Sequence, residues 1–309
     1  MQVAPTVQIG IDFGGTKIEA AALDANGNFL ARTRVPNPRS YEPALQAVRE
    51  LVQSIEREVG AQGTIGVGAP GSISPHTGLV RNANSVWLNG RPFHEDLSRT
   101  LGREIRIAND ANCLALSEVV DGAAQGSAVT FAVILGTGCG GGLVVNGQLI
   151  NGANGIAGEW GHTPLPWPTR EEFDIPQCWC GQRSCLETWI SGSGLQRDFA
   201  QHTGKTLDGE AIISAAHAGQ PDAQAALRRY VNRLGRALAC IANIVDPDTI
   251  VIGGGMSNVT EIYSALPEII SAHVFCDRWQ ARIVPAQWGD SSGVRGAARL
   301  WQASGQGRD

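Results

Sequence analysis

The sequence has no long basic run and no apolar run approaching the roughly 20 residues of a membrane-spanning helix. Its formal net charge is −5, so the basic surface that usually accompanies nucleic-acid binding is missing, and we expect no nucleic-acid partner. The N-terminal stretch lacks the charged segment and apolar core of a signal peptide. We therefore expect a cytoplasmic protein that does not associate with membranes.

Seven cysteines, an odd number, argue against a framework of disulfide bonds. Three of them lie together in "CWCGQRSC", which favours a metal site in a reducing compartment. The hydrophobic content of 43% and charged content of 17% are ordinary for a soluble globular protein. At 309 residues the chain is long enough for two domains.

A glycine-rich stretch contains Gly136, Gly138 and Gly141, which match the dinucleotide-binding pattern G-x-G-x-x-G. That pattern must follow a strand and open a helix. Here "TFAVIL" predicts a strand, but the following "GLVVNGQLI" contains two short β-prone runs around Asn146-Gly147, which is typical of a hairpin. We interpret the glycines as a turn between two strands, and not as an NAD site.

The same order occurs in residues 7–35: strand "VQIGID", glycine turn "FGGTK", strand "IEAAALD", turn "ANGN" and strand "FLARTRV". Two unrelated glycine-rich hairpins are the simpler alternative. A repeated unit of this kind is what a duplicated actin/hexokinase-type fold requires, in which each lobe presents a hairpin turn to the phosphates of ATP in the interlobe cleft.

The remaining segments alternate between strand and helix patterns. Residues 42–59 carry apolar side chains at helical spacing, and later segments add further strands and helices. We expect an α/β fold of two lobes (duplicated ribonuclease H-like). The predicted small lobe covers 1–120 and the large lobe 121–290, and a last helix at about 291–302 packs back on the small lobe.

The first glycine turn carries groups that suit phosphate. Asp12 ends the first strand, and the next residues are Gly14, Gly15, Thr16 and Lys17. Small residues let backbone N–H groups approach phosphate oxygens, while a hydroxyl and an ammonium add donors. Asp12 would hold Mg²⁺ through water, because magnesium prefers oxygen ligands and keeps some of its waters. The alternative is an ordinary hairpin with a satisfied turn aspartate.

The motif "NDAN" (109–112) follows a strand and begins a helix. A carboxylate there is commonly just an N-cap. The functional interpretation is that Asp110 is a general base, because phosphoryl transfer to a sugar alcohol needs an acceptor for the hydroxyl proton. Asn109 would then be a neutral ligand for a sugar hydroxyl.

The segment 162–185 predicts a zinc loop with one imidazole and three thiolates, a set that suits tetrahedral structural zinc. The predicted ligands are His162, Cys178, Cys180 and Cys185. Buried free thiols are the alternative. Zinc on one ring nitrogen of His162 would orient the other toward substrate. With Glu159 and Glu187, His162 forms a polar set suited to sugar hydroxyls, although surface solvation alone would explain either glutamate.

A further glycine turn follows the strand in "VIGGGMS". Gly254 and Gly255 in this turn would receive the adenosine of a nucleotide. A simple strand end is the alternative.

Several motifs together resemble the ROK family (repressor, open reading frame, kinase) from about residue 7 to 302. They include "IGIDFGGTKIEAAALD", "NANSVWLNG", "ANDANCLALSE", "LGTGCGGG", "GEWGH" with "CWCGQRSCLE", and "IVIGGGMSNV". The resemblance implies ATP, Mg²⁺ and structural Zn²⁺ as cofactors, a two-lobed fold, and phosphorylation of a hexose at its 6-hydroxyl. It also implies a homodimer.

The resemblance assigns roles to individual residues. Asp110 matches the catalytic base, and the sugar ligands match Asn84, Asn109, Glu159, His162 and Glu187. The phosphate turns match Thr16, Lys17, Gly136, Thr137 and Gly138, and Gly254 and Gly255 lie near the nucleotide. The spacer between His162 and Cys178 is longer than in the family's glucokinases, as in the fructokinase branch. "GEWGHTPLPW" and "GDSSGVRGAA" also resemble that branch, so we expect fructose as substrate, with mannose weaker or comparable.

Three other interpretations compete with a fructokinase. A sugar-responsive regulator of this family carries a DNA-binding segment ahead of D-x-G-G-T, and in this sequence that motif begins at Asp12. A catalytically inactive sugar-binding module is opposed by Asp110, Lys17 and the two phosphate turns. A kinase for glucose, mannose or an N-acetylated hexosamine shares the same hydroxyl-binding set.

Overall fold

The computed structural model describes residues 7–173 and 176–302, arranged in two compact units. The first unit contains the residues up to Gly126, Gly142–Gly158, and Gln287 onward. The second contains Ser127–Gly141 and Glu159–Ala286. The chain therefore enters the second unit at Ser127, near the predicted boundary, but Gly142–Gly158 belongs to the first unit, which the sequence did not indicate.

The first unit is built on a five-stranded sheet of order β3-β2-β1-β4-β7. Its strands are β1 (Gln8–Phe13), β2 (Lys17–Leu23), β3 (Phe29–Pro36), β4 (Thr64–Ala69) and β7 (Arg106–Asn109). β1, β2 and β3 form the predicted antiparallel meander, while β4 is parallel to both β1 and β7. A small antiparallel pair, β5 (Ser72–Ile73) and β6 (Val80–Arg81), follows β4.

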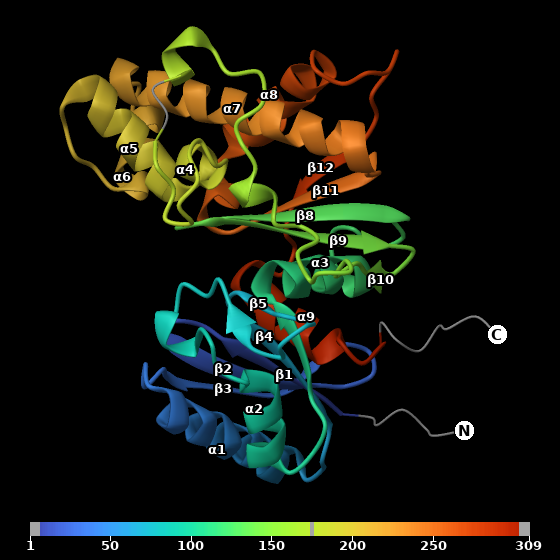
Figure 1. Ribbon diagram of the computed structural model, residues 1–309. Coiled ribbons are helices and arrows are strands. Elements are labelled where there is room, and N and C mark those ends of the chain that lie inside the picture. The colour runs from blue at the N-terminus through green and yellow to red at the C-terminus, as the bar shows by residue number, and fades with distance from the viewer. Residues whose placement is uncertain (1–6, 174–175, 303–309) are drawn as a thin grey trace. The chain divides into compact units, whose positions relative to one another are not determined.

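Helices cover both faces of this sheet (Figure 1). They are α1 (Tyr41–Val59), α2 (Phe93–Leu101), α3 (Asp110–Asp121) and α9 (Ser292–Arg299). α1 confirms the helix predicted at 42–59: Leu45, Val48, Val52 and Ile55 are buried in the core, and the helix ends at Gly60, whose φ is 73°. α9 lies within the helix predicted at 291–302 but is shorter.

α9 packs against the sheet at a distance that only glycine allows. A Cβ at Gly10 of β1 would lie 1.9 Å from the carbonyl oxygen of Val294, and one at Gly66 of β4 would lie 1.8 Å from that of Ala297. The helix backbone therefore rests directly on two strands. This contact sets the start of α9 beside Asp12, because a Cβ at Gly293 would lie 3.4 Å from the Asp12 carboxyl carbon.

The second sheet has the order β10-β9-β8-β11-β12. Its strands are β8 (Val129–Leu135), β9 (Cys139–Val145), β10 (Gln148–Leu149), β11 (Thr249–Gly253) and β12 (Arg282–Pro285). Gly136 and Gly138 form the turn from β8 to β9, so a strand and not a helix follows them, and the predicted turn between two strands is confirmed. Asn146 and Gly147 both have positive φ, as the predicted two-residue hairpin requires.

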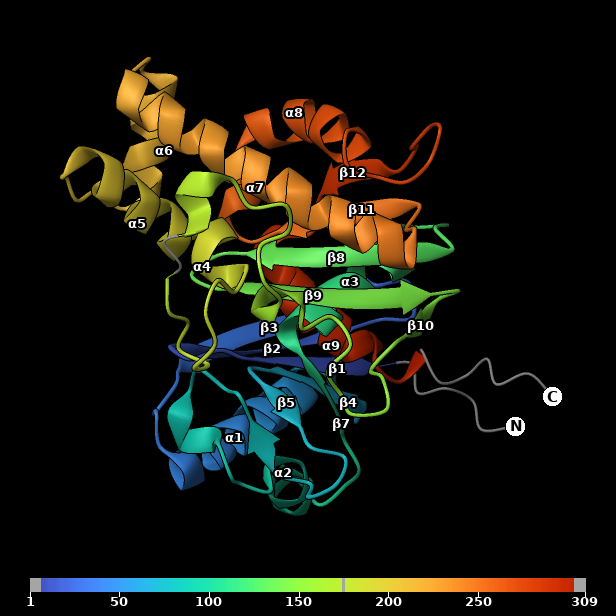
Figure 2. The same ribbon diagram turned by 45° about the horizontal axis from the view of Figure 1, so that its top comes forward.

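The helices of the second unit gather on one side of strands β8, β11 and β12 (Figure 2). They are α4 (Glu187–Ile190), α5 (Gly192–Thr203), α6 (Gly209–His217), α7 (Pro221–Val245) and α8 (Thr260–Ser271). α7 begins with Pro221, whose fixed φ suits a first turn, and buries Leu234 and Leu238. Among the described residues, no helix has the length and apolar character needed to span a membrane.

Candidate active site

Two carboxylates of the first unit lie at one edge of its sheet. β1, β4 and β7 are parallel neighbours, so their carboxyl ends meet at the same edge. Asp12 is near the end of β1, and Asp110 follows β7 as the first residue of α3. Burial, followed by the charges of Asp110 and Glu19, raises the pKa of Asp12 to about 6. A cation at this edge would relieve that repulsion, so the donor set fits Mg²⁺.

The turn from β1 to β2 is held in shape by Asn37, a residue that the sequence analysis missed. Asn37 is buried, its side-chain amide donates to the carbonyl of Gly14 at 2.7 Å, and its backbone N–H donates to that of Thr16 at 2.9 Å. Gly15 and Thr16 remain exposed. The turn therefore keeps its backbone amides in a fixed arrangement at the surface, as a phosphate site requires.

Asn109, and not Asp110, is the N-cap of α3. The side-chain oxygen of Asn109 accepts from the N–H of Ala111 at 2.8 Å, and its amide nitrogen donates to the carbonyl of Gly71 at 3.2 Å. Asn109 thus has protein partners at both ends of its amide. Its main structural role is to orient the first turn of α3.

Asp110 projects from that first turn. Its carboxylate also accepts from the N–H of Ala111 at 2.8 Å. Although Asp110 is exposed, the surrounding protein removes enough of its hydration to raise the pKa of its carboxyl above the usual range. A more basic carboxylate at the start of a helix is what a general base requires.

Asn84 lies in an exposed loop beside the phosphate turn. Asn89 fixes this loop by accepting from the N–H of Ala83 at 2.9 Å and donating to its carbonyl at 3.0 Å. The next residue, Ser85, approaches the glycine turn: a Cβ at Gly15 would lie 3.4 Å from its hydroxyl oxygen. The predicted sugar ligand Asn84 is therefore next to the predicted phosphate turn of the same unit.

In the second unit, the two glycine turns lie together at the ends of parallel strands. β8 ends at Leu135 and β11 at Gly253, and the two strands are neighbours. Gly254 has a φ of 80°, and a Cβ there would lie 2.6 Å from the carbonyl oxygen of Leu135. The predicted phosphate turn (136–138) and the predicted nucleotide turn (254–255) thus share one edge of the second sheet.

The turn that carries Glu159 and His162 packs directly on the start of β9. The indole N–H of Trp160 donates to the carbonyl of Gly140 at 3.0 Å, and its ring meets that of Phe131 edge-on. A Cβ at Gly161 would lie 2.1 Å from the carbonyl oxygen of Cys139. These contacts place His162 beside the phosphate turn.

Glu187 is the first residue of α4 and touches the same turn. One of its carboxylate oxygens accepts from the backbone N–H of Cys139 at 3.0 Å, and the other accepts from the indole N–H of Trp179 at 2.6 Å. The phosphate turn is also held from α5, because Gly192 donates to the carbonyl of Gly136 and Ser193 to that of Thr137. Trp179 and Ser193 were not among the site residues predicted from the sequence.

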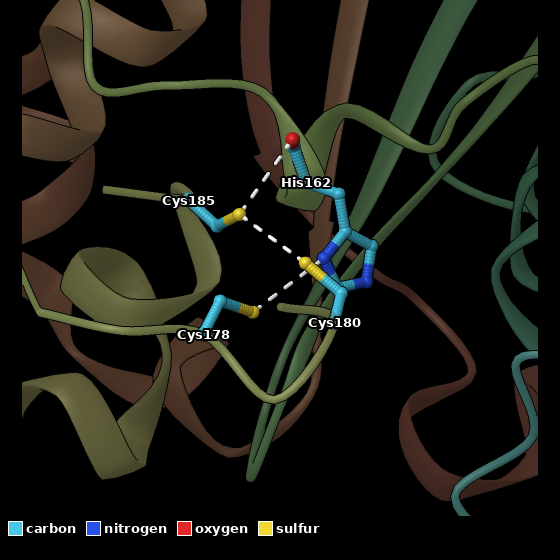
Figure 3. Close-up of side chains that lie close together, drawn as sticks. All are labelled: His162, Cys178, Cys180 and Cys185. Carbon is cyan, nitrogen blue, oxygen red and sulfur yellow. Dashed lines mark hydrogen bonds between the residues drawn. The ribbon is translucent and has the colours of Figure 1, made fainter. Parts of the chain in front are cut away.

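The four predicted zinc ligands come together in the second unit (Figure 3). Their ligand atoms lie within 4.8 Å of one another. The sulfurs of Cys180 and Cys185 are 3.6 Å apart, and that of Cys178 is 3.7 Å from Nδ1 of His162. A tetrahedral ion at about 2.3 Å from each sulfur sets two sulfurs about 3.8 Å apart, so the set fits zinc. Residues 174–175 of the predicted loop lie outside the described residues.

Comparison with known proteins identifies the family. The ROK family model matches residues 8–304. The chain belongs to the ROK family. It is 42% identical over 296 residues to an N-acetyl-D-glucosamine kinase of Yersinia pseudotuberculosis serotype IB (strain PB1/+). The aligned region covers 94% of this chain and 97% of the relative.

Solved structures of ROK proteins share the fold. The ROK hexokinase from Thermus thermophilus matches with a TM-score of 0.84 and 32% identity, over 94% of this chain and 96% of that one. A ROK glucokinase from Streptomyces griseus, in complex with glucose and AMPPNP, matches with a TM-score of 0.78 and 29% identity, over 95% and 98%. The protein is an ATP-dependent ROK sugar kinase with the two-lobed α/β fold of hexokinase-type enzymes.

The comparisons do not support fructose as its substrate. Relatives with 40–42% identity from several bacteria are N-acetyl-D-glucosamine kinases. They favour the N-acetylhexosamine alternative over the fructokinase branch. The two segments that suggested fructose, 158–167 and 289–298, are short, and they weigh less than identity along nearly the whole chain.

Proposed function

We propose that this ROK kinase transfers the γ-phosphoryl group of ATP to the 6-hydroxyl of N-acetyl-D-glucosamine. The observation that carries the substrate is the 42% identity to an N-acetyl-D-glucosamine kinase across 94% of the chain. The proposed chemistry follows from the groups gathered at the sheet edges of the two units.

In the proposed reaction, the backbone amides of Gly14–Thr16 and Gly136–Gly138 and the ammonium of Lys17 bind phosphate oxygens. Lys17 is half exposed and lies 3.9 Å from Glu19, whose carboxylate also pairs with Arg32, so its stem is anchored while its charge stays accessible. Mg²⁺, when bound through water at Asp12, supplies positive charge against the transferring phosphoryl group.

Asp110 accepts the proton of the attacking hydroxyl in this proposal. Loss of hydration raises the pKa of Asp110, which makes its carboxylate a stronger base than that of an ordinary aspartate. The proposed sugar ligands are Asn84, Asn109, Glu159, His162 and Glu187, the residues that the family resemblance assigns to the sugar.

The zinc loop has a structural role in the proposal. Zn²⁺ on His162, Cys178, Cys180 and Cys185 would fix the imidazole, whose Nδ1 faces Cys178, and leave Nε2 oriented as a donor or acceptor. Glu187 follows Cys185 by two residues, so zinc binding would also hold Glu187 at a constant distance from the imidazole of His162. The expected homodimer and the cytoplasmic location rest on the sequence and the family resemblance, and both stay predictions.

A coupled assay of ADP release with single sugars tests the proposal, and NMR of the product identifies the phosphorylated oxygen. We expect turnover of N-acetyl-D-glucosamine that depends on Mg²⁺ and ATP, with the ester at the 6-position. Phosphorylation at another oxygen would contradict the assignment of Asp110 as base for the 6-hydroxyl. Fructose turnover without N-acetyl-D-glucosamine turnover would restore the fructokinase interpretation.

A further inference from the structure

Trp179 joins two of the proposed sugar ligands. It lies inside the zinc loop, between Cys178 and Cys180, and the family resemblance assigned it no role. Its indole N–H donates to Oε1 of Glu187 at 2.6 Å. Its ring meets the imidazole of His162 edge-to-face, with the ring centroids 5.2 Å apart and the planes at 85°. One side chain therefore contacts both a carboxylate and an imidazole of the candidate site.

The other oxygen of Glu187 is held as firmly. Oε2 accepts from the N–H of Cys139 at 3.0 Å, and it lies 2.6 Å from where a Cβ at Gly138 would be. Glu187 thus fits against the phosphate turn only because residue 138 is glycine. A carboxylate has about four acceptor positions, so two hydrogen bonds to the protein leave two for sugar hydroxyls.

The orientation of the carboxylate depends on Trp179 in particular. The N–H of Cys139 restrains one oxygen, but a carboxylate held at one oxygen still rotates about its side-chain bonds. The second hydrogen bond removes that freedom. Trp179 is itself restrained, because the residues on either side of it are proposed zinc ligands.

The exposure of Trp179 separates this arrangement from core packing. The side chain is 62% exposed, so it buries little apolar surface and adds little to the stability of the unit. An indole whose polar edge is engaged and whose body is accessible is typical of a binding surface.

We propose that Trp179 is a positioning residue of the sugar site: it orients Glu187 through its N–H and His162 through its ring, and so couples the zinc loop to sugar affinity. This inference rests on the proposed function, because it assumes that Glu187 and His162 bind the sugar. It predicts an effect on sugar binding that is separate from metal binding and from ATP.

The test compares Trp179→Phe, which keeps an aromatic ring and removes the N–H, with Trp167→Phe as a matched control. Trp167 is an exposed tryptophan of the same unit, and its ring contacts His273 and not the candidate site. We expect Trp179→Phe to raise the KM for N-acetyl-D-glucosamine about tenfold, the size of a lost hydrogen bond to a charged group. The kcat, the KM for ATP and the zinc content should change little, and Trp167→Phe should match the wild type in all four.

Two further measurements separate positioning from folding. Binding of N-acetyl-D-glucosamine should change the tryptophan fluorescence of the wild type and of Trp167→Phe, and this change should be lost in Trp179→Phe at saturating sugar. In a double-mutant cycle, Trp179→Phe should add little to the KM effect of Glu187→Gln, because the two residues act as one unit.

The inference fails, and the proposed function stands, if the wild type turns over and Trp179→Phe keeps the wild-type sugar KM and fluorescence change. Loss of zinc from Trp179→Phe would also overturn it, because the residue would then act on the metal site. If the wild type turns over no hexose, the proposed function fails and the role of Trp179 fails with it.

Discussion

Asp12, near the end of β1, and Asp110, which follows β7, lie at the same edge of the first sheet, and after burial the charge of Asp110 is the largest influence that raises the pKa of Asp12 to about 6. The folded protein therefore holds a carboxylate where its negative charge is unfavourable. Strain of this kind is common where a protein binds a cation, because the ion compensates the repulsion when it arrives.

Asp12→Asn should stabilise the protein in the absence of Mg²⁺ and abolish Mg²⁺-dependent turnover. The pKa of Asp12 is higher in the folded protein than in the unfolded chain, so ionisation of this carboxyl lowers the free energy of unfolding. Stability therefore falls as the pH rises from about 4, the ordinary pKa of an aspartate, through about 6, its pKa in the folded protein. We expect a higher Tm for the variant at pH 8 and no difference from wild type near pH 4, measured by thermal unfolding in EDTA. An equal or lower Tm at pH 8 would show that the carboxylate is not repelled.

Asp110→Asn should lower kcat by about 10²–10⁴-fold, the usual loss for a general base, while the sugar KM changes only a few-fold. In the wild type, kcat should fall as the pH drops through the raised pKa of Asp110, because the protonated carboxyl accepts no proton. Steady-state kinetics across pH measure both effects. A variant with near wild-type kcat would remove Asp110 from the chemistry.

Metal analysis should find one zinc per chain. Cys185→Ser should lose the metal, because Cys185 is buried among the other three ligands, and the Tm should fall with it. Cys276→Ser is the control, since Cys276 is exposed and outside the cluster, and it should retain zinc and stability. Purified wild-type protein without zinc, obtained without a chelator, would exclude the proposed site.

Gly296→Ala should destabilise the first unit by about 3 kcal/mol, because the added Cβ would lie 1.7 Å from the carbonyl oxygen of Cys113 and force α9 away from α3. Gly209→Ala is the control: the nearest atom to its added Cβ is 3.7 Å away, so the change should stay within about 0.5 kcal/mol. Denaturant unfolding measures both. Equal stabilities would mean that α9 does not pack as closely as described.

Local sequence patterns were sufficient to predict much of the fold and of the candidate site. Asn146-Gly147 and the glycines around it favour turns through their own backbone conformations. The two hairpin units could therefore be predicted from the sequence. The four proposed zinc ligands could be predicted because three of them are close together in the sequence. In contrast, Asn37, the residue after β3, supports the first phosphate turn through hydrogen bonds to Gly14 and Thr16. The assignment of 142–158 to the first unit depends on tertiary packing. Neither has a signal in the nearby sequence.

The identity of the sugar substrate was the property that the sequence motifs predicted least well. Glu159, His162 and Glu187 offer hydrogen bonds to any polyhydroxylated sugar, and discrimination depends on which polar groups are left unpaired by the wrong one. The short segments that suggested fructose do not show which polar groups of the site each sugar would leave unpaired. Likewise, Trp179 became visible as a positioning residue only when its N–H was found 2.6 Å from Glu187.

The most direct test of the central claim is a competition assay with equal concentrations of N-acetyl-D-glucosamine, glucose, mannose and fructose in one reaction with Mg²⁺ and ATP. Initial rates of the four sugar phosphates, separated by chromatography and identified by their retention times against authentic standards, give the ratios of kcat/KM directly. We predict that N-acetyl-D-glucosamine 6-phosphate forms at least tenfold faster than fructose 6-phosphate, a difference of about 1.4 kcal/mol in transition-state binding. A tenfold excess of fructose 6-phosphate or of another hexose phosphate would contradict the proposed substrate.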